Sequence, residues 1–252
     1  MLADRIRMMG APHWLILFGA ILLAWGGLFL MAVPGDLRAL SDIYGADFWQ
    51  TLCTVTLDGA GFASGVVMWA LMSAAMMLPT ALPAFATYDD LGRQTEARFG
   101  MLVAGYALVW LGFSVLAAAG QMVLYRVDLI GVLGDSRSPL FSAALLLLAG
   151  FYQFSPVKEA CLSKCRQPLT FFMSHWDEGP LRNGLRLGLV CLGCCWALML
   201  LAFVGGVMNL GFMGIATLIM VLEKMPAVGR FLTRPLGVVL VAGAFAVMLR
   251  AL

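Results

Sequence analysis

Sulfur-bearing side chains gather inside the most apolar stretches of this chain. Cys191, Cys194 and Cys195 fall within one short segment, and Met199 follows a turn later. Because each residue of an α-helix turns by about 100°, the three thiols share one helix face and the methionine extends it. Thiols and thioethers are ligands that select Cu(I), and thiolates also bind Zn(II). The spacing predicts a buried metal site made of sulfur ligands.

A methionine stripe occupies a second apolar run. Met72 and Met76 are spaced i, i+4 and share a helix face, and Met77 follows directly. These thioethers would serve as secondary sulfur donors, together with Met199. Packing is the competing interpretation, because methionine readily fills irregular gaps between helices.

Two further cysteines stand in a polar setting. Cys161 and Cys165 are also spaced i, i+4, and Lys158, Lys164 and Arg166 lie close to them in the sequence. Nearby positive charge favours the thiolate, which is the form of cysteine that binds a metal ion. We therefore expect both residues to be ligands of the same site.

Glu223 is an acidic group at the end of an apolar run. An acidic side chain within a transmembrane segment is costly and usually functional, so Glu223 is a candidate ligand. Lys224 follows directly, however, and the two could instead pair at the level of the lipid headgroups. Histidines and carboxylates are too few in these runs for a hard-metal site, which leaves Cu(I) or zinc as the expected ion.

The composition shows which kind of element must position these groups. The chain has 252 residues, of which 62% are hydrophobic and only 12% charged. Soluble domains are about one quarter charged, so the composition predicts an integral membrane protein whose main partner is the lipid bilayer. The net charge of +2 gives no reason to expect nucleic acid as a partner.

Seven stretches have the length of about 20 mostly apolar residues that a membrane-spanning helix needs. They are residues 13–33, 63–86, 101–125, 139–160, 183–204, 207–225 and 235–252, and the boundary between the fifth and the sixth is the least defined. The predicted fold is all-α, a polytopic transmembrane helix bundle of about seven spans that forms a single domain over residues 1–252.

The distribution of basic residues predicts the orientation of the bundle. With the N-terminus inside, twelve lysines and arginines fall in inner segments and four in outer ones. Since basic residues accumulate on the cytoplasmic side, the N-terminus is expected in the cytoplasm. The predicted sulfur ligands then share the cytoplasmic half of the bundle. Cys53, alone in an outer loop, is not expected to form a disulfide within the chain.

One short repeat is compatible with internal symmetry. The tetrapeptide Trp-Ala-Leu-Met occurs at 69–72 and again at 196–199, in predicted helices of opposite direction. Inverted-repeat membrane proteins show this relation, and the bundle could contain an inverted three-plus-three repeat.

Four motifs carry a resemblance to a known family. They are Trp69-x-x-Met72-x-x-Ala75-Met76-Met77-x-Pro79, Pro156-x-Lys158-x-x-Cys161-Leu-x-x-Cys165-Arg166-x-Pro168, Gly193-Cys194-Cys195-Trp196-x-Leu198-Met199 and Glu223-Lys224. In content and order they resemble a bacterial family of predicted metal-binding integral membrane proteins, a domain of unknown function. The resemblance implies metal binding and a multi-pass location in the bacterial inner membrane, but no reaction, substrate or particular metal.

Three functions fit these observations. The first is the handling of a metal ion, most readily Cu(I), without enzymatic activity. The second is a non-enzymatic subunit or assembly factor of a larger membrane complex, or a homo-oligomer, in which the cysteines serve packing. The third is a membrane thiol oxidoreductase, because Cys191-x-x-Cys194 has the spacing of redox motifs. An apolar, buried setting slows thiolate attack and argues against the third function.

Overall fold

The computed structural model describes residues 12–32, 55–92 and 98–251. Within these ranges every regular element is a helix, and Ile130 and Ser136 form an isolated β-bridge. The elements are α2 (Pro12–Ala32), α5 (Gly59–Gly92), α6 (Phe99–Arg126), α7 (Pro139–Tyr152), α8 (Pro156–Arg166), α9 (Pro168–Met173), η3 (Trp176–Glu178), α10 (Pro180–Leu200), α11 (Ala202–Gly205), α12 (Leu210–Lys224) and α13 (Gly229–Ala251). The all-α prediction is confirmed for this part of the chain, and Cys53 lies outside it.

Five stretches of the described chain are long and apolar enough to cross a membrane. They are α2, α5, α6, α13 and the segment Pro180–Gly205, which joins α10 to α11. Together α7 and α8 make a sixth candidate, bent by 61° at their junction. The predicted sixth span is represented by α12, which has 15 residues and is shorter than the usual length of a span. The number of seven spans therefore stays a prediction.

The bend between α7 and α8 has a local cause. Ser155 is in an extended conformation with ψ 134°, and Pro156 follows at the first position of α8. Proline disfavours a helical conformation of the preceding residue and has no N–H to continue the ladder of α7. The Ser155 hydroxyl accepts a hydrogen bond from the N–H of Val157 and so caps the new helix. The predicted continuous helix 139–160 is thus two helices, and the second carries Cys161 and Cys165.

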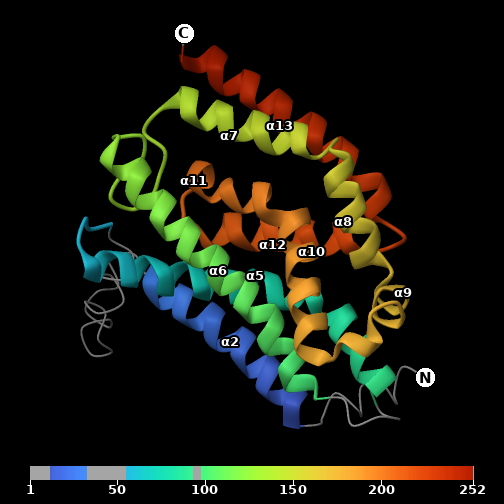
Figure 1. The fold of residues 1–252 in the computed structure, drawn as a ribbon. Helices are drawn as coiled ribbons and strands as arrows, with labels where there is room; N and C mark the ends of the chain where they lie inside the picture. The colour runs from blue at the N-terminus through green and yellow to red at the C-terminus, as the bar shows by residue number, and fades with distance from the viewer. Residues whose placement is uncertain (1–11, 33–54, 93–97, 252) are drawn as a thin grey trace.

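The helices form a bundle in which α10 is enclosed (Figure 1). In this view α2, α5 and α6 lie on one side, α7 and α13 run side by side on the other, and α10 and α12 lie between them. Glycines allow α10 to approach α6 closely: a Cβ at Gly105 would lie 2.3 Å from the carbonyl oxygen of Leu181, and one at Gly184 would lie 2.1 Å from that of Leu102. Small residues at such crossings let two helix backbones touch.

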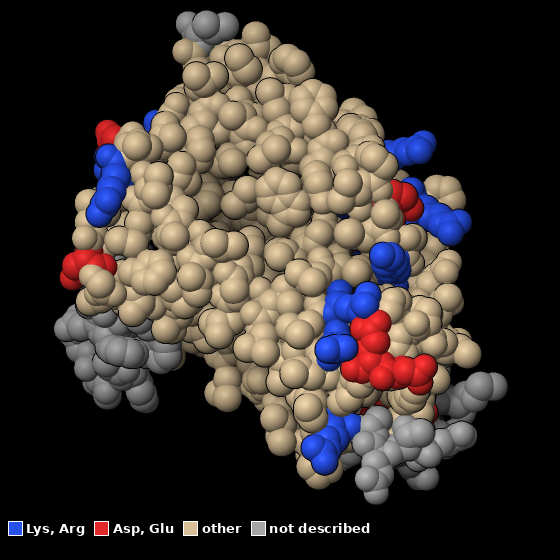
Figure 2. All heavy atoms as spheres, viewed as in Figure 1, with Lys and Arg blue, Asp and Glu red and all other residues tan. Residues whose placement is uncertain are grey.

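The surface has two charged sides and an apolar region between them. Figure 2 shows lysines, arginines and acidic residues at opposite edges of the molecule, with a wide uncharged surface between the edges. Large apolar side chains are strongly exposed on the protein surface, for example Leu23 at 77% and Leu116 at 73%. Exposed apolar surface on this scale requires an apolar partner.

The close crossing of α6 and α10 gives a first prediction. Gly105→Ala should destabilise the protein by about 2 kcal/mol, because the added methyl group overlaps the backbone of α10. Gly112→Ala is the matched control on α6, since a Cβ there meets nothing within 4 Å, and it should change stability by less than about 1 kcal/mol. Unfolding in a mild detergent measures both, and equal stability of the two variants would contradict a backbone contact between α6 and α10.

Candidate metal centre

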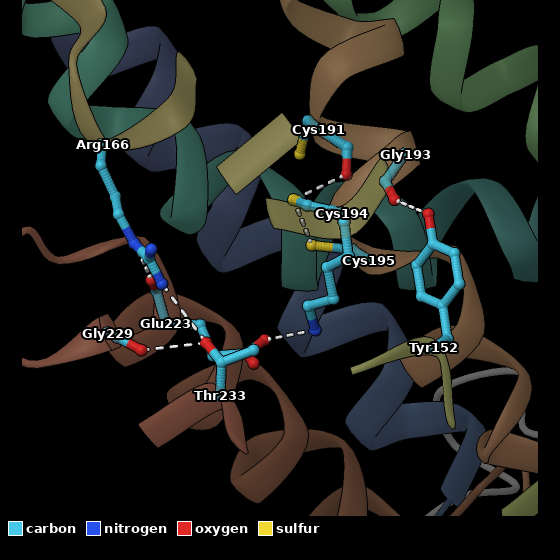
Figure 3. A network of polar contacts seen from close by, with 10 residues as sticks. Tyr152, Arg166, Cys191, Gly193, Cys194, Cys195, Glu223, Gly229 and Thr233 are labelled. Carbon is cyan, nitrogen blue, oxygen red and sulfur yellow. Dashed lines mark hydrogen bonds and ion pairs between the residues drawn. The ribbon is translucent and has the colours of Figure 1, made fainter. Parts of the chain in front are cut away.

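Three cysteines of α10 meet inside the protein. The sulfur atoms of Cys191, Cys194 and Cys195 all lie within 4.8 Å of one another, and each residue is only 1% exposed. The sulfur atoms of Cys194 and Cys195 are 3.2 Å apart, and the Cys194 thiol donates a hydrogen bond of 3.0 Å to the carbonyl of Cys191 (Figure 3). These residues, called the thiol triad below, could hold one metal ion.

The dimensions of the thiol triad are close to those of a metal site. With metal–sulfur bonds of about 2.3 Å, three ligating sulfur atoms lie about 4 Å from one another. The sulfur atoms of the thiol triad are therefore already close to this spacing. To bind an ion, the distance of 3.2 Å between the sulfur atoms of Cys194 and Cys195 must increase by less than about one ångström. Rotation of a cysteine side chain supplies such a movement without displacing the helix.

A buried lysine points at the thiol triad from α12. The Nζ atom of Lys224 lies 2.9 Å from the sulfur of Cys191 and donates a second hydrogen bond, of 2.6 Å, to the hydroxyl of Thr80 on α5. In the described part of the chain no carboxylate forms an ion pair with it. An ammonium group in contact with a sulfur atom stabilises the thiolate, which is the form that binds a metal ion.

Tyr106 connects the thiol triad to α5 and α6. Its hydroxyl lies 3.1 Å from the sulfur of Cys191 and 3.0 Å from the carbonyl oxygen of Met77, to which it donates. Tyr106 is 1% exposed, so these contacts lie in the core. Cys191 is therefore held from two sides, by a lysine of α12 and a tyrosine of α6.

Helix α8 adds two thiols beside the thiol triad. Cys161 and Cys165 are half-buried and pack against the core. A Cβ at Gly193 would lie 2.7 Å from the sulfur of Cys161, so this thiol touches the backbone of α10. Cys165 is near enough to Cys194 and Lys224 to interact electrostatically with both. All five cysteines of the described chain thus gather around one segment of α10.

The last residue of α7, Tyr152, contacts the same segment of α10. Tyr152 donates a hydrogen bond to the carbonyl oxygen of Gly193 (Figure 3), and its ring packs edge-on against Trp196, with centroids 5.1 Å apart. Since α8 follows Tyr152 after a few residues, this contact positions Cys161 and Cys165 against α10.

The predicted methionine donors lie in the same core. Met72, Met76, Met77 and Met199 are all buried. The contact that joins Met77 to the polar network is its backbone carbonyl, which accepts from Tyr106 and from Thr80. The assignment of these thioethers as ligands stays a prediction.

Glu223 belongs to a polar cluster of its own. Its Oε2 atom accepts a hydrogen bond of 2.9 Å from Lys158 of α8, and both side chains are 1% exposed. Arg166 donates to the backbone carbonyl of Glu223 and to Thr233 of α13 (Figure 3). The partner of Glu223 is therefore Lys158, in the interior, and the alternative pairing with Lys224 is absent among the described residues.

The orientations of Glu223 and Lys224 follow from helix geometry. Consecutive residues on a helix point about 100° apart, so one side chain turns to α8 and the other to α5 and α10. Sequence reasoning missed Tyr106. It gave the two lysines other roles, Lys224 as an alternative partner of Glu223 and Lys158 as a nearby charge that favours the thiolates of Cys161 and Cys165. The available signal was the presence of ionisable side chains next to apolar runs, which are costly unless they are paired.

Comparison with known proteins places the chain in a family. Residues 66–247 match the family model PpoB2, described as copper chaperone. The match covers more than two thirds of the chain and includes the five cysteines of α8 and α10. The chain therefore belongs to this family of copper chaperones. No curated protein and no solved structure matches it significantly.

The buried ion pair gives a second prediction. Lys158→Met should destabilise the protein by about 3–5 kcal/mol, because it leaves the Glu223 carboxylate unpaired in the core. The double variant Lys158→Met with Glu223→Met should recover most of this loss, because no charge of the pair stays buried.

A surface pair provides the control. Arg186→Met breaks the half-exposed contact with Glu178 and should cost no more than about 1 kcal/mol. Denaturant unfolding in detergent measures all three variants. If the double variant were as unstable as Lys158→Met alone, the unpaired carboxylate of Glu223 would not be the cause of the lost stability.

Proposed function

We propose that this chain is an integral membrane copper chaperone that holds Cu(I) on the sulfur atoms of Cys191, Cys194 and Cys195. The observation that carries the proposal is the thiol triad itself, three buried sulfur atoms within 4.8 Å in a chain of a copper chaperone family. Binding and passing on an ion requires no chemistry beyond the exchange of sulfur ligands, so no enzymatic activity is proposed.

Several observations support a location in the bacterial inner membrane. Five described stretches are long and apolar enough to span it, and charged residues gather at two opposite sides of the molecule (Figure 2). The excess of basic residues in the predicted inner segments favours a cytoplasmic N-terminus. With this orientation α8 and its two cysteines lie toward the cytoplasm.

The donor set favours Cu(I) over zinc. Structural zinc sites usually have four ligands in a tetrahedron, whereas the thiol triad supplies three sulfur atoms. The two histidines of the chain make other contacts: His13 lies 3.3 Å from Asp89, and His175 bonds to Ser174 and Phe171. A site of thiols alone matches the preference of the softer ion.

Lys224 completes the site electrostatically. Two or three thiolates around one Cu(I) leave a net negative charge, which is unfavourable in a buried region of low dielectric constant. The Lys224 ammonium, 2.9 Å from Cys191, offsets this charge from a position that the buried hydrogen bond to Thr80 maintains. We propose that Lys224 is a positioning residue, which keeps Cys191 in the thiolate form and does not bind the ion.

Cys161 and Cys165 are the proposed route to the thiol triad. They are more exposed than the triad and lie against it, Cys161 at Gly193 and Cys165 near Cys194. Cu(I) arriving on a donor thiolate would form a bond to a cysteine of α8 as a bond to the donor breaks. A second exchange would move the ion to Cys194, and the protons of the newly bound thiols would pass to the released ones.

A third prediction tests the thiol triad. Cys194→Ser with Cys195→Ser should reduce bound copper from about one ion per chain to a small fraction, because only one thiol of the triad remains and the half-buried thiols of α8 are proposed to hold the ion only in transit. Elemental analysis of anaerobically purified protein, followed by competition with a Cu(I) chelator, measures the loss. An unfolding temperature equal to that of the wild-type protein would confirm that the variant is folded. Undiminished copper in this variant would refute the assignment.

A fourth prediction separates the route from the storage site. Cys161→Ser with Cys165→Ser should leave the bound copper near one ion per chain but slow its uptake from a Cu(I)–glutathione complex by at least about tenfold, since the two more accessible thiols are gone. Ser163→Ala, an exposed position on the same helix, is the control and should load at the wild-type rate. Equal loading rates in all three proteins would exclude the route.

A further inference from the structure

A second cavity lies apart from the thiols, where the bend between α7 and α8 meets the start of α13. Its volume is about 780 Å³, and it lies on the charged side of the molecule at the right of Figure 2. Polar groups line much of it, namely Gln153, Ser155, Glu159, Arg230, Thr233 and Arg234. The copper site uses none of these residues, so the cavity needs its own explanation.

The charge of this cavity is positive. Arg230 and Arg234 are one turn apart on α13, both are exposed, and neither forms an ion pair with another described residue. Glu159, a carboxylate at the rim, is paired with Arg166 at 3.1 Å. Two guanidinium groups therefore line the cavity, and no carboxylate in the described part of the chain pairs with them. The planar guanidinium group of arginine can donate two parallel hydrogen bonds to the oxygen atoms of a phosphate group.

A buried amide lines the same cavity. Gln153 is 4% exposed, and its Oε1 atom is buried without a hydrogen-bond partner among the described residues. α13 packs over this residue so closely that a Cβ at Gly237 would lie 2.8 Å from the Cβ of Gln153. An unpaired buried amide is unfavourable, and because its oxygen and nitrogen are exchangeable by rotation, it can accept from a ligand hydroxyl or donate to a ligand oxygen.

The N-terminus of α8 adds to the attraction for an anion. α8 has 11 residues and begins at Pro156, which lines the cavity together with its capping residue Ser155. The N-terminal end of a helix carries a partial positive charge and favours anions. Two arginines, a buried amide and a helix N-terminus thus converge on one space.

We propose that this cavity binds a phosphate-bearing anion between Arg230, Arg234 and Gln153. The source is an anionic phospholipid headgroup or a free phosphate ion, and the lipid alternative rests on the proposed membrane location. A bound headgroup would link the start of α13 to the start of α8. It would therefore brace the helix that carries Cys161 and Cys165.

The test compares anions on metal-free protein in a neutral detergent. Phosphatidylglycerol at about 100 times its dissociation constant should raise the unfolding temperature of the wild-type protein by roughly 5 °C. Arg230→Gln with Arg234→Gln should abolish this shift. The unfolding temperature without added lipid should stay near the wild-type value, because both side chains are exposed. Arg250→Gln, which removes the exposed arginine at the other end of α13, is the control and should keep the shift.

The outcomes distinguish the sources. A shift with phosphatidylglycerol but not with inorganic phosphate at matched ionic strength assigns the site to the lipid, and a shift with inorganic phosphate assigns it to the free ion. No shift with either, or an equal shift in the double arginine variant, overturns the proposal. Since no copper is present in this experiment, its result is independent of the metal-binding tests.

Discussion

The enclosure of α10 is the constraint on which this structure depends. Gly184 brings the helix into backbone contact with α6, and Gly193 lets Cys161 of α8 touch it from another side. These contacts exclude solvent from the intervening face, so the thiol triad is buried almost completely. The same close packing that stabilises the bundle therefore creates the apolar, water-poor surroundings in which sulfur ligands compete well for a soft ion.

Buried charges determine how the neighbouring helices sit around α10. Lys158 and Glu223 join α8 to α12, and Arg166 ties the end of α12 to α13. Because a charge without its partner is costly in the core, these contacts restrict α8 to a narrow range of positions. Lys224 then reaches Cys191 as a consequence of where α12 is held. Lys224 thus connects α12 to Cys191 of the candidate metal centre.

The proposed function combines a buried storage site with a more accessible pair of thiols. A chaperone must bind copper firmly enough to protect it and must still release it, and ligand exchange between adjacent sulfur atoms meets both requirements. The half-buried cysteines of α8 and the fully buried cysteines of α10 differ in access but share one chemistry. The bend before Pro156 makes this arrangement geometrically available, since it turns α8 out of the direction of α7.

Sequence alone determined the helical class, the apolar stretches and the shared face of Cys191, Cys194 and Cys195, because composition and helical periodicity are local properties. It also predicted that Cys161 and Cys165 belong to the same site; both lie beside α10, and their role as ligands stays a prediction. The tertiary structure decided the bend at Ser155, the pairing of Glu223 with Lys158, and the contacts of Lys224 and Tyr106 with Cys191. Partners separated by 33 to 85 positions meet only through helix packing, and no local pattern specifies which neighbour a buried side chain will face.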